Sequence, residues 1–284
     1  MKVIETVRDM QDFSEDLRLR GKRIAFVPTM GYLHDGHLRL MEEGKRRGDC
    51  LVTSIYVNPT QFGPGEDLDK YPRDFARDER LSKDVGVDVI FYPSNPQMYP
   101  EQYHTYVTVE DITTNLCGLT RPTHFRGVAT VCAKLFNIVK PHVTIFGRKD
   151  FQQLAVIKRM VADLNMDIEV IGIPTVREPD GLAMSSRNAY LKEGARESAL
   201  SLSRSLRRAA NLYNRGERNA GVILQEVKDF IEKQPDTKID YVKICDTETM
   251  ADVESAEEKR SVLALAVWVG TPWLIDNYVF GETI

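Results

Sequence analysis

The chain has 284 residues, of which 42% are hydrophobic and 28% are charged. This composition is sufficient to bury a substantial core and excludes a disordered chain. The formal net charge is −4, from 38 basic and 42 acidic residues, so no basic excess indicates a nucleic-acid partner or a membrane surface.

The cysteines and the N-terminus bear on the cellular compartment. Four cysteines are scattered without a Cys-x-x-Cys pair, which predicts reduced core thiols rather than a disulfide scaffold or a zinc module. The first residues lack the apolar core of a signal peptide, and no run approaches the roughly 20 apolar residues of a membrane span. We therefore expect a cytoplasmic protein without a membrane partner.

The first elements alternate between helix and strand. Thr6 can cap a helix that stops at Gly21. A buried strand is expected from Ile24 to Val27, ending at Pro28, which lacks the N–H that a central strand requires. A helix should then begin near Gly36. The next expected elements are a strand at Cys50 to Val57, a helix at Asp74 to Lys83, a strand at Val87 to Phe91 and an edge strand at Thr105 to Val109.

The alternation continues to about residue 175. The expected elements are a helix at Val128 to Val139, a strand at Val143 to Phe146, a helix from Phe151 to Leu164 and a strand at Ile168 to Ile173. This order predicts an α/β fold with a Rossmann-like, doubly wound parallel sheet over residues 1–175. Ligands of such sheets bind beyond the carboxyl ends of the strands, where the polar loops after Val27, Val57 and Phe146 should lie.

The pattern changes after Tyr190. Two long helices are followed by three short strands, which predicts a smaller C-terminal α+β domain over residues 176–284. The expected ranges are Glu193 to Arg215 and Asn219 to Lys233 for the helices, and Ile239 to Ile244, Val262 to Val269 and Trp273 to Val279 for the strands.

Two histidines stand at the start of the second helix. His34 and His37 are three residues apart, so a helical turn would place both imidazoles on one face. The free N–H groups and the positive dipole end of a helix N-terminus favour anions there, which indicates a phosphate or nucleotide site. Two alternatives remain from these residues alone. They could be surface histidines in a loop, or part of a zinc site, although no third and fourth ligands stand nearby.

Other polar residues suit the same chemistry. There is no Gly-x-Gly-x-x-Gly sequence and no Walker-type loop, so phosphate binding must come from elsewhere. Lys149 follows the predicted strand at Val143 to Phe146, and Met184 to Asn188 combines two hydroxyl groups with a guanidinium. The carboxamides of Gln61 and Gln153 can hold a small hydroxy acid, and Pro28, Met30 and Phe62 could line an apolar wall.

Several of these segments together resemble one family. The carrying sequences are Pro28 to His37 (PTMGYLHDGH), Asn58 to Phe62 (NPTQF), Arg121 to Val128 (RPTHFRGV), Phe146 to Leu154 (FGRKDFQQL), Met184 to Asn188 (MSSRN) and Leu274 to Asn277 (LIDN). This ordered set closely resembles the pantothenate synthetases. Such enzymes join pantoate to β-alanine with ATP and Mg²⁺, release AMP and pyrophosphate through a pantoyl adenylate, and typically form homodimers.

The resemblance also implies roles for individual residues. His34 and His37 would contact the ATP triphosphate, with His37 as proton donor. Lys149 would bind phosphate oxygens of ATP and act with the histidines in catalysis. Pantoate and β-alanine would be held by Gln61 and Gln153, with Met30 and Asn58. The remaining ATP contacts would come from Met30, Gly147, Asp150, Val176, Met184, Ser185, Ser186 and Arg187, with Asp150 at the ribose. The Met184 to Asn188 loop near the hinge would close with the smaller domain as a lid.

Two positions depart from the family pattern, and one group of ligands is not indicated. Arg148 stands where relatives usually carry Glu or Gln, and Trp273 stands where they usually carry Arg. No acidic pair marks a metal site. Two other functions stay open: a related nucleotidyltransferase with a stable nucleotide product, and a nucleotide-binding module without turnover.

Overall fold

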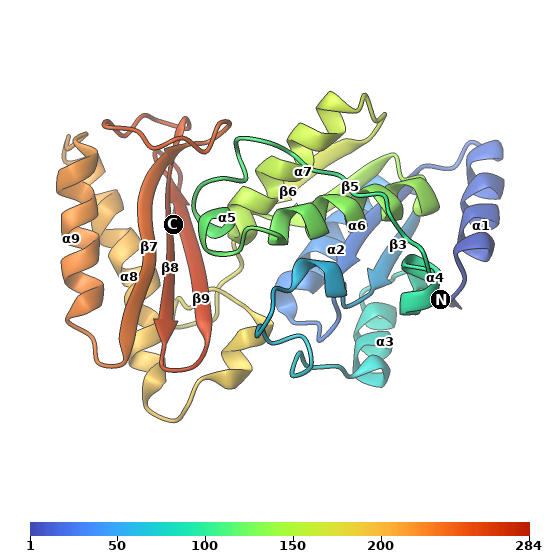
Figure 1. Cartoon of the computed structure of the whole chain (residues 1–284), viewed down its shortest axis with the longest axis horizontal. Coiled ribbons are helices and arrows are strands. Elements are labelled where there is room, and N and C mark those ends of the chain that lie inside the picture. The colour runs from blue at the N-terminus through green and yellow to red at the C-terminus, as the bar shows by residue number, and fades with distance from the viewer. The chain divides into compact units, whose positions relative to one another are not determined.

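The computed structural model describes all residues from 1 to 284, and the chain divides into two compact units (Figure 1). The first unit comprises Met1–Val109, Arg121–Arg148 and Val156–Pro174. The second comprises Glu110–Thr120, Lys149–Ala155 and Thr175–Ile284. Two short segments before residue 175 thus group with the second unit.

A six-stranded parallel sheet forms the centre of the first unit, in the order β1-β4-β3-β2-β5-β6. This confirms the predicted doubly wound α/β class, because the chain runs from β2 outward in one direction through β3 and β4 and in the other through β5 and β6. The strands are β1 (Lys2–Ile4), β2 (Ile24–Thr29), β3 (Cys50–Ile55), β4 (Val89–Phe91), β5 (Val143–Gly147) and β6 (Glu169–Ile173).

Helices cover both faces of this sheet. Helix α2 packs on β2, β3 and β5 and also contacts α3, whereas α1 and α6 pack together on the opposite face of β2. The handedness of parallel crossovers places α7 on the α6 side as well. The helices are α1 (Val7–Leu19), α2 (Asp35–Arg47), α3 (Phe75–Asp84), α4 (Asn95–Met98), α5 (Cys117–Thr120), α6 (His124–Val139) and α7 (Phe151–Asp163), with 3₁₀ turns η1 (Pro59–Gln61) and η2 (Arg148–Asp150).

Pro28 lies inside strand β2, so the expected end of the strand at this residue is wrong. The Thr29 carbonyl accepts the N–H of Tyr56 at 3.1 Å, so Thr29 faces β3. Because alternate residues of a strand face opposite neighbours, Pro28 faces β5. Pairing with β5 ends at Phe26, which fits a proline as the next residue that faces β5, because it has no N–H to donate.

The expected edge strand at Thr105 to Val109 is also wrong. The N–H of Val107 donates to the hydroxyl of Thr130 in α6 at 2.9 Å, and the ring of Tyr106 lies 3.8 Å from the guanidinium carbon of Arg126. Contacts with a helix therefore replace a strand ladder. The sheet edge is instead formed by β1, a three-residue strand too short for its periodicity to be recognised.

The loops that were expected at one edge do follow neighbouring strands. β2 lies between β3 and β5, and all three run in the same direction. Their carboxyl ends therefore lie side by side, at the point where the chain leaves β2 and β5 toward opposite sides of the sheet. Such a reversal is where doubly wound sheets bind ligands.

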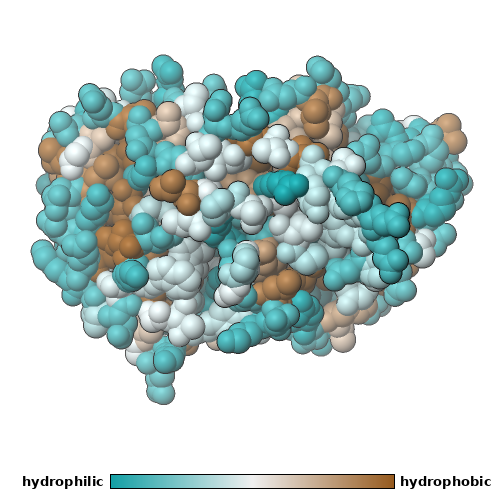
Figure 2. All heavy atoms as spheres, in the orientation of Figure 1, coloured by the Kyte–Doolittle hydropathy of each residue, from teal (hydrophilic) through white to brown (hydrophobic).

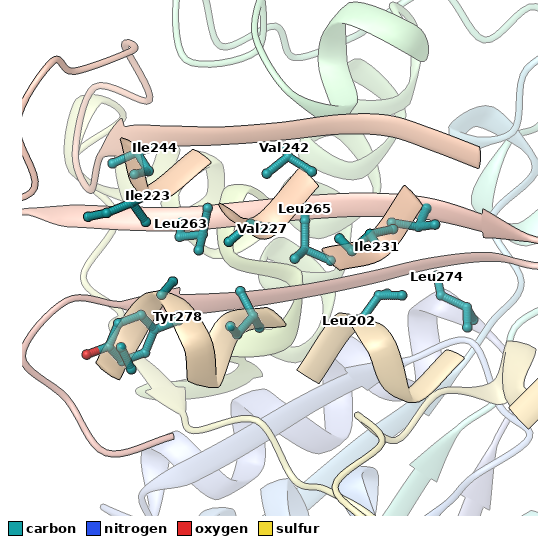
Figure 3. Packing of buried hydrophobic residues seen from close by; sticks show 14 of the residues in the cluster. Leu202, Ile223, Val227, Ile231, Val242, Ile244, Leu263, Leu265, Leu274 and Tyr278 are labelled. Atoms are coloured by element: carbon teal, nitrogen blue, oxygen red, sulfur yellow. The ribbon is translucent and has the colours of Figure 1, made fainter. Parts of the chain in front are cut away.

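The second unit contains a three-stranded antiparallel sheet, which confirms the expected smaller α+β domain. Its strands are β7 (Thr237–Asp246), β8 (Ser261–Val269) and β9 (Trp273–Val279), and its long helices are α8 (Ala195–Asn214) and α9 (Ala220–Glu232). Figure 3 shows Leu263 and Leu265 of β8 facing apolar side chains such as Ile223 and Val227 of α9. This shared apolar layer holds the helices on one face of the sheet.

The surface is mostly polar, and the cysteines are reduced, as the sequence predicts. In Figure 2 hydrophilic and neutral residues cover most of the visible face, and apolar residues form smaller patches between them. All four cysteines are free thiols in buried positions. None of the helices combines the length and the apolar character needed to cross a membrane.

Candidate active site

The histidine pair forms the start of helix α2. His34 is the N-cap residue in an extended conformation, and its Nδ1 accepts the N–H of Gly36 at 3.1 Å. His37 occupies the third helical position, and its Nδ1 accepts the N–H of His34 at 3.3 Å. The two ring centroids lie 4.0 Å apart. The rings therefore lie together, as their spacing predicts, although His34 caps the helix instead of belonging to it.

This capping arrangement determines the tautomer of both rings. A neutral imidazole carries one proton, and a nitrogen that accepts a backbone N–H cannot carry it. The proton of neutral His34 and His37 is therefore on Nε2, which makes Nε2 a donor in each ring. Two such donors at a helix N-terminus, where the helix dipole also favours negative charge, suit a phosphate.

A buried carboxylate holds the turn that leads to the histidines. Asp78 of α3 is 1% exposed, and its two oxygens accept the N–H groups of Tyr32 and Leu33, each at 2.7 Å. Burial raises the pKa of Asp78, while these two N–H groups and the nearby Arg77 lower it. Sequence analysis missed this residue, although an acidic side chain on the apolar face of a predicted helix was a signal.

The turn itself needs a glycine. Gly31 has a φ of +81°, and a Cβ there would lie 2.9 Å from an oxygen of Asp78 and 3.0 Å from Ile55. The N–H of Gly31 is bound to the hydroxyl of Thr29 at 3.2 Å. Met30 is thereby carried on a tightly constrained turn between β2 and α2.

Gln61 lies on the 3₁₀ turn η1 beyond β3. Its carboxamide nitrogen is 3.0 Å from the sulfur of Met30, and its side-chain oxygen accepts from Asn58 at 3.1 Å. Its main-chain oxygen is held by His124 Nδ1 at 2.8 Å and by Arg121 at 3.2 Å. The structure therefore brings together Met30, Asn58 and Gln61, and it shows what the Arg121 to Val128 motif contacts.

A cavity of about 500 Å³ opens in the first unit beside this turn. It is lined at the carboxyl ends of β2, β3 and β4, by residues that include Met30, Gly31, Tyr56, Asp78 and Tyr92. Met30 is the one residue of the expected ligand set that lines it. The ring of Phe75 stacks on Tyr92 with centroids 4.2 Å apart, so the wall at this end is aromatic.

Of the other residues expected to bind ATP or pantoate, Gly147 ends β5 in the first unit. The rest belong to the second unit: Lys149, Asp150, Gln153, Val176 and Met184 to Arg187. The carbonyl of Lys149 accepts from the Asn277 side chain at 2.8 Å. Asp276 is the neighbour of Asn277 on β9 and is 2% exposed. Its two carboxylate oxygens accept hydrogen bonds from the two terminal nitrogens of Arg177, at 2.6 and 3.1 Å. Such two-point pairing fixes orientation as well as charge. The Leu274 to Asn277 motif thus holds two segments with expected ATP contacts, one through the main-chain carbonyl of Lys149 and the other through the side chain of Arg177.

The segment around Met184 is ordered by its own backbone. The N–H of Met184 donates to the carbonyl of Val176 at 3.0 Å, which brings these two expected ATP residues together. Ser185 caps the 3₁₀ turn η3 (Ser186–Tyr190), its hydroxyl accepting the N–H of Arg187 at 3.3 Å. Asn188 donates to Glu178 and to the Ala183 carbonyl, at 2.9 and 3.1 Å.

Asp150 ends the turn η2 and Gln153 lies in the first turn of α7, and both are half-buried. The neighbouring Gln152 is buried and hydrogen-bonded to the backbone of Ile112, Asn115 and Cys117. Gln152 therefore has a structural role, and Gln153 is the glutamine with exposed surface. Of the two departures from the family pattern, Trp273 donates to Asp240 at 3.0 Å across the small sheet, whereas Arg148 lies in the turn η2.

The fold and this geometry define a class: an α/β protein with a candidate site for anionic ligands at the carboxyl edge of a parallel sheet. The family model described as pantoate-beta-alanine ligase matches residues 2–279. The chain belongs to this family.

Relatives along the whole chain agree with this assignment. The chain is 68% identical over 284 residues to a pantothenate synthetase of Syntrophus aciditrophicus, and the alignment covers 100% of this chain and 99% of the relative. A solved pantothenate synthetase from Thermus thermophilus has 41% identity and a TM-score of 0.93, covering 98% of this chain and 99% of that one. A pantoate-beta-alanine ligase from Francisella tularensis, complexed with beta-gamma ATP and beta-alanine, has 30% identity and a TM-score of 0.82, covering 100% and 99%.

Proposed function

We propose that this chain condenses pantoate with β-alanine to form pantothenate, with the conversion of ATP to AMP and pyrophosphate. The observation that carries the proposal is the match of residues 2–279 to the pantoate-beta-alanine ligase family. The histidine pair at the N-terminus of α2 supports it, because this reaction brings two anions together and needs donors for phosphate oxygens.

The reaction has two steps. A carboxylate oxygen of pantoate attacks the α-phosphorus of ATP, the bond to the β-phosphate oxygen breaks, and pyrophosphate leaves from pantoyl adenylate. The amine of β-alanine then attacks the acyl carbon, the bond to AMP breaks, and the amine loses a proton as the amide forms. Alignment alone can contribute roughly 7 to 11 kcal/mol to such steps, so no nucleophilic side chain is needed.

In this proposal each residue of the site has a role in binding or catalysis. His34 and His37 donate from Nε2 to the triphosphate, His37 also supplies a proton, and Lys149 neutralises developing charge. Gln61 and Gln153 hold pantoate, with Met30 and Asn58 beside Gln61. The other ATP contacts are assigned to Met30, Gly147, Asp150, Val176, Met184, Ser185, Ser186 and Arg187. The Met184 to Asn188 segment closes over ATP with the smaller domain of residues 176–284.

The metal requirement follows from the nucleotide. No three His, Cys, Asp or Glu side chains stand where they could hold a metal ion together, so no protein ligand set is assigned. Mg²⁺ commonly binds substrate phosphates with few protein ligands, and we infer that it accompanies ATP as the nucleotide complex.

Two further parts of the proposal concern the whole protein. We place the enzyme in the cytoplasm, which the four free, buried cysteines support. We also propose a homodimer, on the family resemblance. Light scattering after size-exclusion chromatography measures the mass in solution, and the mass of one chain would contradict the dimer.

One assay tests the proposed reaction against its two alternatives. Release of AMP should require pantoate and β-alanine together with ATP. A related nucleotidyltransferase would release pyrophosphate and keep a stable nucleotide product, and a binding module would bind ATP without turnover. AMP release that is independent of β-alanine would contradict the proposal.

A further inference from the structure

The side chain of Asn58 is completely engaged by the protein. Asn58 is 1% exposed. Its Nδ2 donates to Gln61 Oε1 and to the Gly127 carbonyl, each at 3.1 Å. Its Oδ1 accepts from the hydroxyl of Tyr99 at 2.8 Å and from Thr60, whose hydroxyl and N–H lie at 3.0 and 3.4 Å. An amide has two N–H donors and one carbonyl oxygen, so no hydrogen-bonding capacity of Nδ2 is left for a ligand.

Two backbone groups determine which end of the Asn58 amide is nitrogen. The Gly127 carbonyl can only accept, so the amide nitrogen must face it. The N–H of Thr60 can only donate, so the amide oxygen must face that residue. The phenol of Tyr99 can donate or accept, so it does not set the orientation of the amide. With Oδ1 placed on its side by the two backbone groups, the Tyr99 hydroxyl donates to Oδ1 at 2.8 Å.

The orientation of Asn58 in turn determines the orientation of Gln61. Because Asn58 offers an N–H, the Gln61 atom facing it must be Oε1, and Nε2 is the opposite end, 3.0 Å from Met30 Sδ. Gln61 is 8% exposed. Nε2 donates one of its two N–H groups to Met30 Sδ, so one N–H donor is left for a ligand beside Met30. Such a donor suits a carboxylate or hydroxyl oxygen of a small hydroxy acid and rejects a donor in that place.

We propose that Tyr99 is a positioning residue for pantoate binding, which acts through Asn58 to hold Gln61 with its Nε2 toward the substrate. The inference rests on the proposed function and deepens it, because it names the atoms by which the Gln61 side recognises an oxygen acceptor. It also assigns Asn58 to positioning Gln61 rather than to direct contact. Tyr99 lies 41 residues from Asn58 in sequence, just beyond α4.

A double-mutant cycle tests this relay. Tyr99→Phe removes only the hydroxyl and should raise the KM for pantoate about 2- to 10-fold, the range for one lost neutral hydrogen bond. The KM values for ATP and β-alanine should stay unchanged. In a Gln61→Ala background, Tyr99→Phe should change the pantoate KM less than about 2-fold, because the group that it positions is gone.

Matched variants separate positioning from general structural damage. Tyr103 packs edge-on against Tyr99 with centroids 5.0 Å apart, and Tyr103→Phe should leave the pantoate KM unchanged. Asn58→Asp replaces the Nδ2 donor with an oxygen facing Gln61 Oε1, so it should raise the pantoate KM more than Tyr99→Phe does. Thermal unfolding of each variant checks that it is folded.

The outcomes are distinguishable. An unchanged pantoate KM in Tyr99→Phe, or an equal effect with and without Gln61, would overturn the role of Tyr99 while the wild-type enzyme still makes pantothenate. A wild-type chain that does not use pantoate would instead remove the proposed function and this inference together.

Discussion

The two ring nitrogens of His37 have separate roles. Nδ1 accepts a backbone N–H and completes the start of α2, whereas Nε2 is the donor that our proposal assigns to the triphosphate. A substitution that keeps one end and removes the other can therefore separate folding from catalysis.

His37→Asn provides this separation. The asparagine oxygen can replace Nδ1 as acceptor, but nothing replaces Nε2. We expect the folded variant to lose about 10²-fold in kcat, as removal of a preorganised donor often causes, with little change in thermal stability. His37→Ala should lose kcat similarly and also about 1 kcal/mol of stability with the cap. Steady-state kinetics and thermal unfolding measure both effects, and near-normal kcat in the Asn variant would refute the assigned role.

Asp78 should give the protein a measurable pH dependence. Burial raises the folded-state pKa of its carboxyl, so the unfolded chain ionises first as the pH rises. The free energy of unfolding that Asp78 contributes is therefore highest below about pH 4 and falls as the pH rises through the folded pKa, by about 1.4 kcal/mol per unit of pKa difference.

Asp78→Asn removes this titration and serves as the reference. The free energy of unfolding of the wild type minus that of the variant should decrease from about pH 4 upward. Urea unfolding at a series of pH values measures it, and a difference that increases with pH would contradict the direction. Loss of one acceptor should also loosen the turn at Tyr32 and Leu33 and lower kcat.

At the scale of elements, α6 passes unusually close to the turn η1. A Cβ at Gly127 would lie 2.3 Å from the Thr60 carbonyl oxygen and 2.6 Å from the Cα of Gln61. These are backbone atoms, so they cannot move aside cheaply. The absence of a side chain at one position of α6 is therefore what allows η1, and with it Gln61, to lie against the helix.

Gly127→Ala should consequently displace η1. We expect a loss of about 1 to 3 kcal/mol in stability, typical of overpacking, together with a higher KM for pantoate. Gly221→Ala in α9 is a matched helical control, because the added Cβ meets only the side-chain oxygen of Asn219, at 3.1 Å. It should leave the pantoate KM unaltered. Gly127→Ala with wild-type stability and KM would show that the contact is not limiting.

At the scale of the whole molecule, the chain folds as two units with separate sheets and separate cores. The proposed closure of the Met184 to Asn188 segment over ATP makes a prediction at this scale. Limited trypsin digestion at Arg187 should slow several-fold when ATP and Mg²⁺ are added, because a closed segment is less accessible. Cleavage at an exposed site far from this segment, such as Arg20 at the end of α1, should not slow. Equal digestion of both sites with and without ATP would argue against closure.

Local sequence patterns were sufficient for much of this architecture. Hydrophobic periodicity placed the helices and strands, and their alternation indicated a parallel sheet with its ligands at the carboxyl edge. Capping residues such as Thr6, which accepts the N–H of Asp9 at 3.1 Å, act within a few residues of themselves. The spacing of His34 and His37 belongs to the same category, because one turn of chain decides whether the two rings meet.

Tertiary structure decided what depends on distant partners. Pro28 lies in a central strand that continues by pairing with β3 after its pairing with β5 ends at Phe26. Thr105 to Val109 contacts α6 instead of forming a strand. Asp78 binds Leu33 across 45 residues, and Tyr99 binds Asn58 across 41. The sequence by itself thus determined most of the elements and the sheet edge at which the candidate site is proposed. Only the folded chain decided how Gln61 is oriented and how the turn before the histidines is held, because hydrogen bonds between segments distant in sequence fix Asn58 and that turn.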